Sequence, residues 1–275
     1  MLLRILKRVS CFIFIVPLIS CTSAHQFINH ADNIARQNYL SKKIVRTNLF
    51  SLVTYSKFND TGQSVHVYIE GDGHAFTANK YPSSDPTPHD PVALRLAALD
   101  PQPNVLYIAR PYQYLGEQSD AEQKYWTSHR FSQDVVDAVD QAIDLYKEPV
   151  HSSRIKLFGF SGGGAIATLL SAQRGDVDFL VTIAGNLDHR MHSEIHKVDR
   201  LKGSLDPIDH VARLIGVEQI HLVGENDRIV PKEIAEYFCQ MSRDAGGRCQ
   251  VIKVRGVSHA NGWAKLWPRL LKDRF

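Results

Sequence analysis

Residues 156–170 read KLFGFSGGGAIATLL, an apolar run that ends at one serine, passes three glycines and resumes with helix-forming residues. Gly159, Ser161 and Gly163 match the pattern Gly-x-Ser-x-Gly. This pattern is typical of a sharp strand-to-helix turn, because the residues two before and two after the serine must be small to avoid colliding. The helix behind the serine aims free N–H groups at the place where negative charge develops on a substrate. The stretch therefore predicts that Ser161 is a nucleophile; a plain glycine-rich turn is the alternative.

A serine hydroxyl becomes a good nucleophile only when a histidine takes its proton and a carboxylate orients that histidine. Downstream, Asp227 follows an apolar strand in HLVGENDRIVP, and His259 follows another strand in VIKVRGVSHANGW. Open α/β sheets build their sites where parallel strands end, so we expect Ser161, Asp227 and His259 to converge at one edge of a sheet. Asp188, which follows the predicted strand 179–184, is the rival for the acid.

The thirteen histidines include one cluster that needs separate treatment. His189, His192 and His196 lie with Asp188 in DHRMHSEIH. A zinc-protease motif would need His-Glu-x-x-His, and Glu194 here falls on another face of any helix. We therefore expect a polar insertion beside the site and no bound metal.

Short apolar segments alternate with amphipathic segments along most of the chain, which indicates repeated βαβ units. Several predicted strands are apolar throughout, as strands covered by helices on both faces must be. The sequence thus predicts an α/β fold with a mostly parallel sheet of about seven or eight strands. The predicted strands span residues 45–55 (one strand or a hairpin), 65–70, 105–109, 155–160, 179–184, 220–223 and 250–254. The predicted helices span residues 91–99, 132–147, 163–173, 231–244 and 260–271, and Val135, Val136, Val139, Ile143 and Leu145 form the core stripe of the second helix.

The composition divides the chain into three parts. Residues 1–20 are basic and then apolar, residues 21–43 are polar and predict a tether with a short helix, and residues 44–275 carry the α/β pattern. The segment 186–216 is the one long insertion, and its content predicts short helices and loop. This insertion is too short for a large cap domain, which predicts an accessible cleft.

Residues 44–275 resemble a compact α/β-hydrolase of the serine esterase type, because GFSGG, VGENDRIVP and VSHANGW follow one another as that family's elbow, acid loop and histidine loop do. The resemblance implies acyl transfer, in which Ser161 attacks a carbonyl carbon, His259 moves the proton and Asp227 holds the histidine. Carboxyl esters are the substrates that the fold most often serves, and amides or thioesters would use the same groups. A binding or envelope-structural protein without turnover is the alternative.

The strand VHVYIE leads into a loop where the α/β-hydrolase family binds the substrate oxyanion. The family's common His-Gly is here Glu70-Gly71. Backbone N–H groups bind an oxyanion without help from a particular side chain. We therefore assign the oxyanion hole to the amides of Gly162 and Asp72, with Gly73 as the alternative to Asp72. A plain tight turn is the competing interpretation.

The N-terminus carries Arg4, Lys7 and Arg8 before an apolar stretch, residues 9–19, which is about half as long as a membrane-spanning helix. This stretch ends in Leu-Ile-Ser-Cys, which resembles a bacterial lipobox. The resemblance implies that residues 1–20 are a signal peptide and that Cys21 carries lipid, which anchors a domain without a spanning helix. The residue after the cysteine is not Asp, which by the same resemblance favours the outer membrane, facing the periplasm. An ordinary cleaved signal is the alternative.

Removal of residues 1–20 takes away three basic residues and no acid, which leaves 29 basic against 29 acidic residues. A neutral surface argues against a nucleic-acid partner. We expect a monomer that acts on a small acyl substrate and uses no cofactor.

Two cysteines remain in the mature chain besides Cys21. Cys239 falls in a predicted helix and Cys249 opens the next predicted strand, so the return of the chain can bring them together. Because disulfides persist in exported proteins, we expect these two cysteines to be bridged. Two buried free thiols are the alternative.

Arg110 ends a strand at the same edge of the sheet as the candidate site. We expect it to form a salt bridge with Glu70 or Asp72, and an acidic group of the substrate is the alternative partner. Trp126 is expected in the core, and Trp263 beside the cleft.

Overall fold

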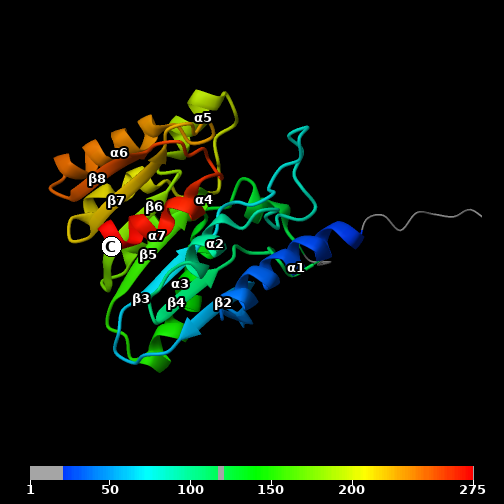
Figure 1. Ribbon diagram of the computed structural model, residues 1–275. Coiled ribbons are helices and arrows are strands. Elements are labelled where there is room, and N and C mark those ends of the chain that lie inside the picture. Colours follow the sequence, from blue (N-terminus) through cyan, green and yellow to red (C-terminus); the bar gives the residue numbers. More distant parts are fainter. Residues whose placement is uncertain (1–20, 117–120, 275) are drawn as a thin grey trace, which may run out of the picture.

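The structure is a computed structural model that describes residues 21–116 and 121–274. The predicted signal peptide, residues 1–20, lies outside the described residues. An eight-stranded sheet runs through the described chain in the order β1-β2-β4-β3-β5-β6-β7-β8 (Figure 1). The pairs β1–β2 and β2–β4 are antiparallel and all the others are parallel, which confirms the predicted fold class. The strands are β1 (Ser41–Arg46), β2 (Ser51–Phe58), β3 (Val65–Ile69), β4 (Asn104–Ile108), β5 (Ile155–Phe160), β6 (Val177–Ile183), β7 (Glu218–Gly224) and β8 (Arg248–Val254).

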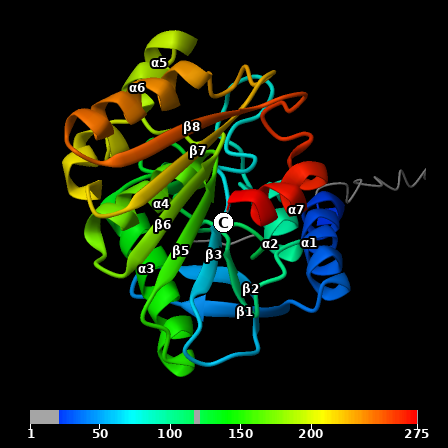
Figure 2. The same cartoon turned by 60° about the vertical axis from the view of Figure 1, so that its left-hand side comes forward.

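Helices cover both faces of this sheet (Figure 2). Side chains alternate between the faces along each strand, so Tyr68 and Phe158 pack into the core beneath α1, α2 and α7. Val67 and Leu157 point the other way, into the core beneath α3 and α4. The helices are α1 (Cys21–Gln37), α2 (Val92–Ala98), α3 (Gln133–Lys147), α4 (Gly162–Gln173), α5 (His189–His196), α6 (Lys232–Asp244) and α7 (Trp263–Arg274), with short 3-10 helices η1 (Gln123–Trp126), η2 (Glu148–Val150) and η3 (Pro207–Leu214).

The ordered domain begins earlier than the composition indicated. β1 starts at Ser41, inside the stretch expected to be a tether, and α1 spans 17 residues where a short helix was expected. Ala31 and Ala35 of α1 are buried in the same core as α2 and α7, and Tyr55 donates a hydrogen bond to Asp32. The polar composition concealed this packing because alanines let α1 approach its neighbours without a broad apolar face.

The predicted core stripe of α3 is correct except at one position. Val135 and its three predicted partners up to Ile143 are buried, but Leu145 is 54% exposed. Tyr146 continues the stripe instead, and its hydroxyl shares a 2.7 Å hydrogen bond with that of Thr54. Positions three and four residues apart share a helix face, whereas a residue two beyond Ile143 points away from that face.

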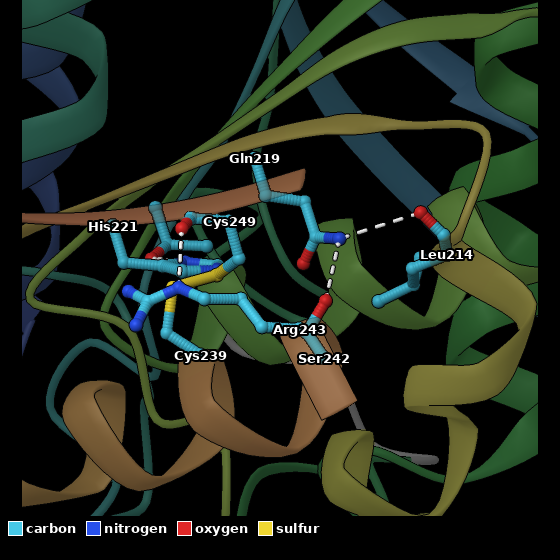
Figure 3. The surroundings of a disulfide bond; sticks show 8 residues. Leu214, Gln219, His221, Cys239, Ser242, Arg243 and Cys249 are labelled. Carbon is cyan, nitrogen blue, oxygen red and sulfur yellow. Dashed lines mark hydrogen bonds between the residues drawn. A yellow bond between two sulfur atoms is a disulfide. The ribbon is translucent and has the colours of Figure 1, made fainter. Parts of the chain in front are cut away.

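Cys239 of α6 and Cys249 of β8 form the predicted disulfide, with Cα atoms 5.4 Å apart (Figure 3). Close by, Arg243 donates from Nε to the carbonyl oxygen of Cys249 at 3.0 Å. Within the described part of the chain, one set of side chains has the spacing of metal ligands, namely His221 with these two cysteines. Its two sulfur atoms are bonded to each other.

The insertion 186–216 holds α5 and η3 and adds no further domain to the described structure. No helix among the described residues has the length and apolar character needed to cross a membrane. Because the insertion adds only these two short helices, no cap domain covers the edge of the described sheet where the parallel strands end.

Candidate active site

Ser161 alone forms the turn between β5, which ends at Phe160, and α4, which begins at Gly162. Its backbone has φ +52° and ψ −119°, a conformation that residues with a side chain rarely adopt. The neighbouring glycines make this turn possible, since a Cβ on Gly159 would lie 2.3 Å from the carbonyl oxygen of Gly163. The strand-turn-helix geometry expected of the Gly-x-Ser-x-Gly stretch is thus present.

The structure brings Ser161, His259 and Asp227 together. Nε2 of His259 lies 3.1 Å from Oγ of Ser161, and Nδ1 of His259 lies 2.9 Å from Oδ2 of Asp227. The three residues follow β5, β8 and β7, whose carboxyl ends lie at one edge of the sheet because these strands are parallel. This order of hydroxyl, imidazole and carboxylate is the one in which a histidine can accept the serine proton while an acid orients it.

The Asp227 carboxylate is fixed by more than the histidine. Its Oδ1 accepts hydrogen bonds from the amides of Ile229 at 2.8 Å and Val230 at 3.0 Å, and its side chain is 1% exposed. Burial alone would raise the pKa of Asp227, but the hydrogen bond and charge of His259 together with the two amides hold that pKa below its usual value. The acid is therefore ionised and immobile at neutral pH.

Asp188, the rival acid, occupies a different kind of position. It is the N-cap of α5 and accepts a 2.8 Å hydrogen bond from the amide of Met191. Helix N-caps commonly use an aspartate in this way. The imidazole of His259 pairs with Asp227 and not with Asp188.

Trp263 holds the backbone of the histidine loop. Its indole Nε1 donates to the carbonyl oxygen of His259 at 2.8 Å. The tryptophan is fully buried, so it lies beside the candidate site as expected but contacts it from the core and does not line its surface. The spacing of four residues between His259 and Trp263, with the helix α7 starting at the latter, is the sequence signal that indicates this contact in retrospect.

The loop after β3 lies directly on the elbow. A Cβ on Gly162 would lie 1.9 Å from Oδ1 of Asp72, so residue 72 covers the start of α4. Gly73, with φ +64°, packs against Pro86 instead, whose carbonyl oxygen would lie 2.1 Å from a Cβ on that glycine. Among the described residues, neither the amide of Asp72 nor that of Gly162 has an acceptor. The amide of Gly73 has no acceptor among these residues either, so the choice between Asp72 and Gly73 as partner of Gly162 stays a prediction.

Glu70, which stands where histidine is common in α/β-hydrolases, stabilises this loop through hydrogen bonds. Its carboxyl group is buried and accepts hydrogen bonds from the amides of Gly71 at 3.0 Å and Ala93 at 3.3 Å and from the hydroxyl of Tyr107 at 3.1 Å. Gln113 adds a 3.0 Å bond to the carbonyl oxygen of Gly71. Burial raises the pKa of Glu70 to about 7.

The three histidines of the insertion do not share a ligand position. His189 is buried, and neither of its ring nitrogens has a hydrogen-bond partner among the described residues. His192 and His196 each donate from Nε2 to the carbonyl oxygen of Ile229, at 3.0 and 2.9 Å. Both therefore link α5 to the loop that carries Asp227.

No family model matches the sequence, and the comparison with curated protein sequences found no similar protein. Comparison with solved structures found many similar folds. Est1E from Butyrivibrio proteoclasticus superposes with a TM-score of 0.59 at 15% identity, over 84% of this chain and 96% of that protein. A putative dienelactone hydrolase from Klebsiella pneumoniae gives 0.59 at 17% identity, over 86% and 98%. An acylaminoacyl peptidase from Pyrococcus horikoshii gives 0.61 at 9% identity, over 85% and 41%.

These similarities define the class of fold. The chain has the α/β-hydrolase fold over nearly all its described length, without a cap domain. At identities of 9 to 17% the likeness concerns the fold alone, and the proteins of similar fold include an esterase from Pyrococcus furiosus as well as a peptidase. The chemistry must accordingly be argued from the side chains.

Proposed function

We propose that the protein is a serine hydrolase that cleaves carboxyl esters through an acyl-enzyme intermediate. The observation that carries this proposal is the chain of hydrogen bonds from Ser161 through His259 to Asp227. The strained backbone of Ser161 supports it, because the conformation exposes the hydroxyl ahead of the helix N-terminus.

In the proposed reaction, Oγ of Ser161 attacks the carbonyl carbon while Nε2 of His259 takes the hydroxyl proton. Asp227 stabilises the imidazolium that forms. The amides of Gly162 and Asp72 donate to the oxyanion, a contribution of about 3 to 4 kcal/mol per donor in well-studied hydrolases. His259 then returns the proton to the leaving oxygen, and water releases the acyl group by the same steps in reverse roles.

The ester class is supported by an esterase from Pyrococcus furiosus and a putative dienelactone hydrolase among the proteins of similar fold. Amide and thioester bonds would use the same groups, and a peptidase is also among those proteins. A panel of esters, thioesters and anilides with a common acyl group separates these classes by kcat/KM.

A fluorophosphonate probe tests the proposal directly, because it labels only an activated serine. The purified protein should be labelled at Ser161, and the Ser161→Ala variant should not. Asp227→Asn should slow labelling by about 10⁴-fold, as loss of the orienting acid does in related machinery, while Asp188→Asn should leave it within about twofold. The absence of labelling in the wild type would leave a binding protein as the better description.

The lipobox resemblance supports a second element of the proposal, namely a lipid anchor at Cys21 that holds the enzyme at the outer membrane, facing the periplasm. Intact-mass measurement on the membrane-bound protein should give a chain that begins at Cys21 and carries acyl groups. Cys21→Ala should release the domain into the soluble fraction. A wild-type protein that is soluble after cleavage of its signal would contradict the anchor.

A further inference from the structure

Two arginines share one carboxylate beside the nucleophile. Nη1 of Arg110 lies 3.4 Å from Oδ1 of Asp72, and Nε of Arg130 lies 3.1 Å from Oδ2 of the same group. The two guanidinium groups lie 5.6 and 5.4 Å from the centre of the Phe131 ring, so the same aromatic side chain contacts both cations. This cluster therefore has two positive charges and one negative charge.

Other acidic groups near this cluster do not neutralise the excess charge. Asp188 caps α5, and Asp206 lies 3.1 Å from Nε of Arg190. Glu70 is buried with its pKa raised to about 7, so it is about half protonated at neutral pH and largely protonated below it. Burial lowers the pKa of Arg110 most. The charge of Asp72 raises it and the charge of Arg130 lowers it again, which leaves that pKa at about 10. The position is thus electropositive in a place that is largely closed to water, where charges interact strongly.

The two arginines differ in how far the protein satisfies them. Arg110 is buried and also donates from Nη2 to the carbonyl oxygen of Arg130. Arg130 has a side chain that is 13% exposed, and among the described residues no group accepts a hydrogen bond from it in good geometry. Asp72 stands at its Nε edge. The two terminal nitrogens, which form the edge that binds carboxylates with two parallel hydrogen bonds, are left without a protein acceptor.

Arg130 is linked to the residue after Ser161 through a single carboxylate. Asp72, its neighbour at 3.1 Å, lies against Gly162, the residue that follows Ser161. One carboxylate therefore separates this guanidinium from the elbow. Burial, followed by nearby positive charges that include Arg130, lowers the pKa values of His189 and His192. Both histidines are therefore neutral at pH 7 and do not compete for an anion.

We propose that Arg130 binds a carboxylate of the substrate, so that the enzyme prefers esters that carry a negative charge near the scissile bond. This inference rests on the proposed function and adds the substrate class to it. Asp72 stays in ion-pair contact with Nε of Arg130, while the substrate carboxylate takes the two terminal nitrogens. The nearby Arg110 adds attraction without direct contact.

Paired esters test this preference and locate the charge. In the first pair, para-nitrophenyl hemiglutarate is compared with its neutral amide analogue, which places the charge on the acyl side. The second pair consists of the butyrate esters of para-hydroxybenzoate and para-hydroxybenzamide. The first of these carries the negative charge on the leaving group, and the second is neutral. For one of the two pairs we expect kcat/KM to favour the anion by at least about tenfold, as charge-assisted bidentate hydrogen bonds allow.

Arg130→Gln should bring that ratio close to one, and Arg130→Lys should retain part of it. Arg200→Gln is the matched control, because Arg200 is 63% exposed and paired with Glu194, and this variant should keep the wild-type ratio. If Arg130→Gln does not fold, the salt dependence in the wild type decides, since kcat/KM for the anion alone should fall as ionic strength rises. Equal rates within both pairs, or a ratio that survives Arg130→Gln, would overturn the inference.

A measurement without turnover separates this inference from the proposed function. Free glutarate should raise the melting temperature of the Ser161→Ala variant by binding to the folded state, and Arg130→Gln in the same background should abolish the shift. Fluorophosphonate labelling of Ser161 in the wild type with no glutarate shift would uphold the hydrolase and reject the carboxylate site. A glutarate shift with no labelling would support the carboxylate site and reject the hydrolase.

Discussion

Gly162 shows how one residue connects the elbow to the oxyanion loop. Any Cβ there would lie 1.9 Å from Oδ1 of Asp72, which the arginine pair holds in place. In Gly162→Ala the Asp72 carboxylate must therefore shift, and because two arginines hold that carboxylate, we expect the strain to reach the loop amide that we assign to the oxyanion. A displacement of about 1 Å can lower kcat/KM by about 100-fold.

The matched control is Gly175→Ala, because a Cβ there meets no atom within 4 Å. Ester hydrolysis and denaturant unfolding should be measured on both variants. Gly162→Ala should lose activity while its denaturant unfolding curve remains cooperative. Equal kcat/KM in the two variants would show that the contact between Asp72 and Gly162 does not position the site.

Glu70 makes stability depend on pH. Burial raises its pKa to about 7, whereas an unfolded glutamate titrates near 4.5. The folded state therefore binds the proton more tightly, so this contribution is complete below pH 4.5 and is lost as the pH rises through 7. The difference is at most about 3 kcal/mol of unfolding free energy.

Glu70→Gln imitates the protonated form and should remove this dependence. Urea unfolding at pH 5 and pH 8 measures it, and the wild type should lose more stability than the variant between the two values. Glu194→Gln, an exposed partner of Arg200, should behave like the wild type. A variant with the wild-type slope would mean that Glu70 is ionised in the folded state throughout.

At the scale of elements, the disulfide joins the middle of α6 to the start of β8, the edge strand that precedes the His259 loop. Its cysteines are ten residues apart, and closing a loop of that length restricts the unfolded chain by about 2 to 3 kcal/mol. The double variant Cys239→Ser/Cys249→Ser should be less stable by that amount. Urea denaturation of the variant, the wild type and the reduced wild type measures this loss of stability. An unchanged midpoint would show that the disulfide does not stabilise the folded protein.

The elements that carry the site were predictable because their signals are local. An apolar strand, a serine between glycines and a helix of small residues fix the elbow within fifteen positions, and every predicted strand that precedes a candidate residue is present. The disulfide was predictable from the return of the chain between α6 and β8. By contrast, α1 and the exposure of Leu145 depend on which neighbours a helix face meets, and that information is not local.

The same distinction holds for the site. The predicted convergence of Ser161 and His259, which are 98 positions apart, followed from the rule that parallel strands end at one edge. The pairing of Arg110 with Asp72 was one of two expected salt bridges. The role of Arg130 was not predictable, because it depends on how the segment before α3 folds onto the β3 loop, and no periodicity specifies that contact.

At the scale of the whole molecule, the open edge of the sheet sets how substrate arrives. The insertion 186–216 contributes only α5 and η3, and His192 and His196 tie α5 to Ile229 in the acid loop. A lid must change position when it meets an interface, whereas two hydrogen bonds hold α5 of this segment to the acid loop. Hydrolysis of para-nitrophenyl butyrate should therefore follow a smooth saturation curve through the solubility limit of the ester. Rates measured below and above that limit, with Ser161→Ala as the blank, check this outcome; a sudden rise at the limit would show that the insertion opens like a lid.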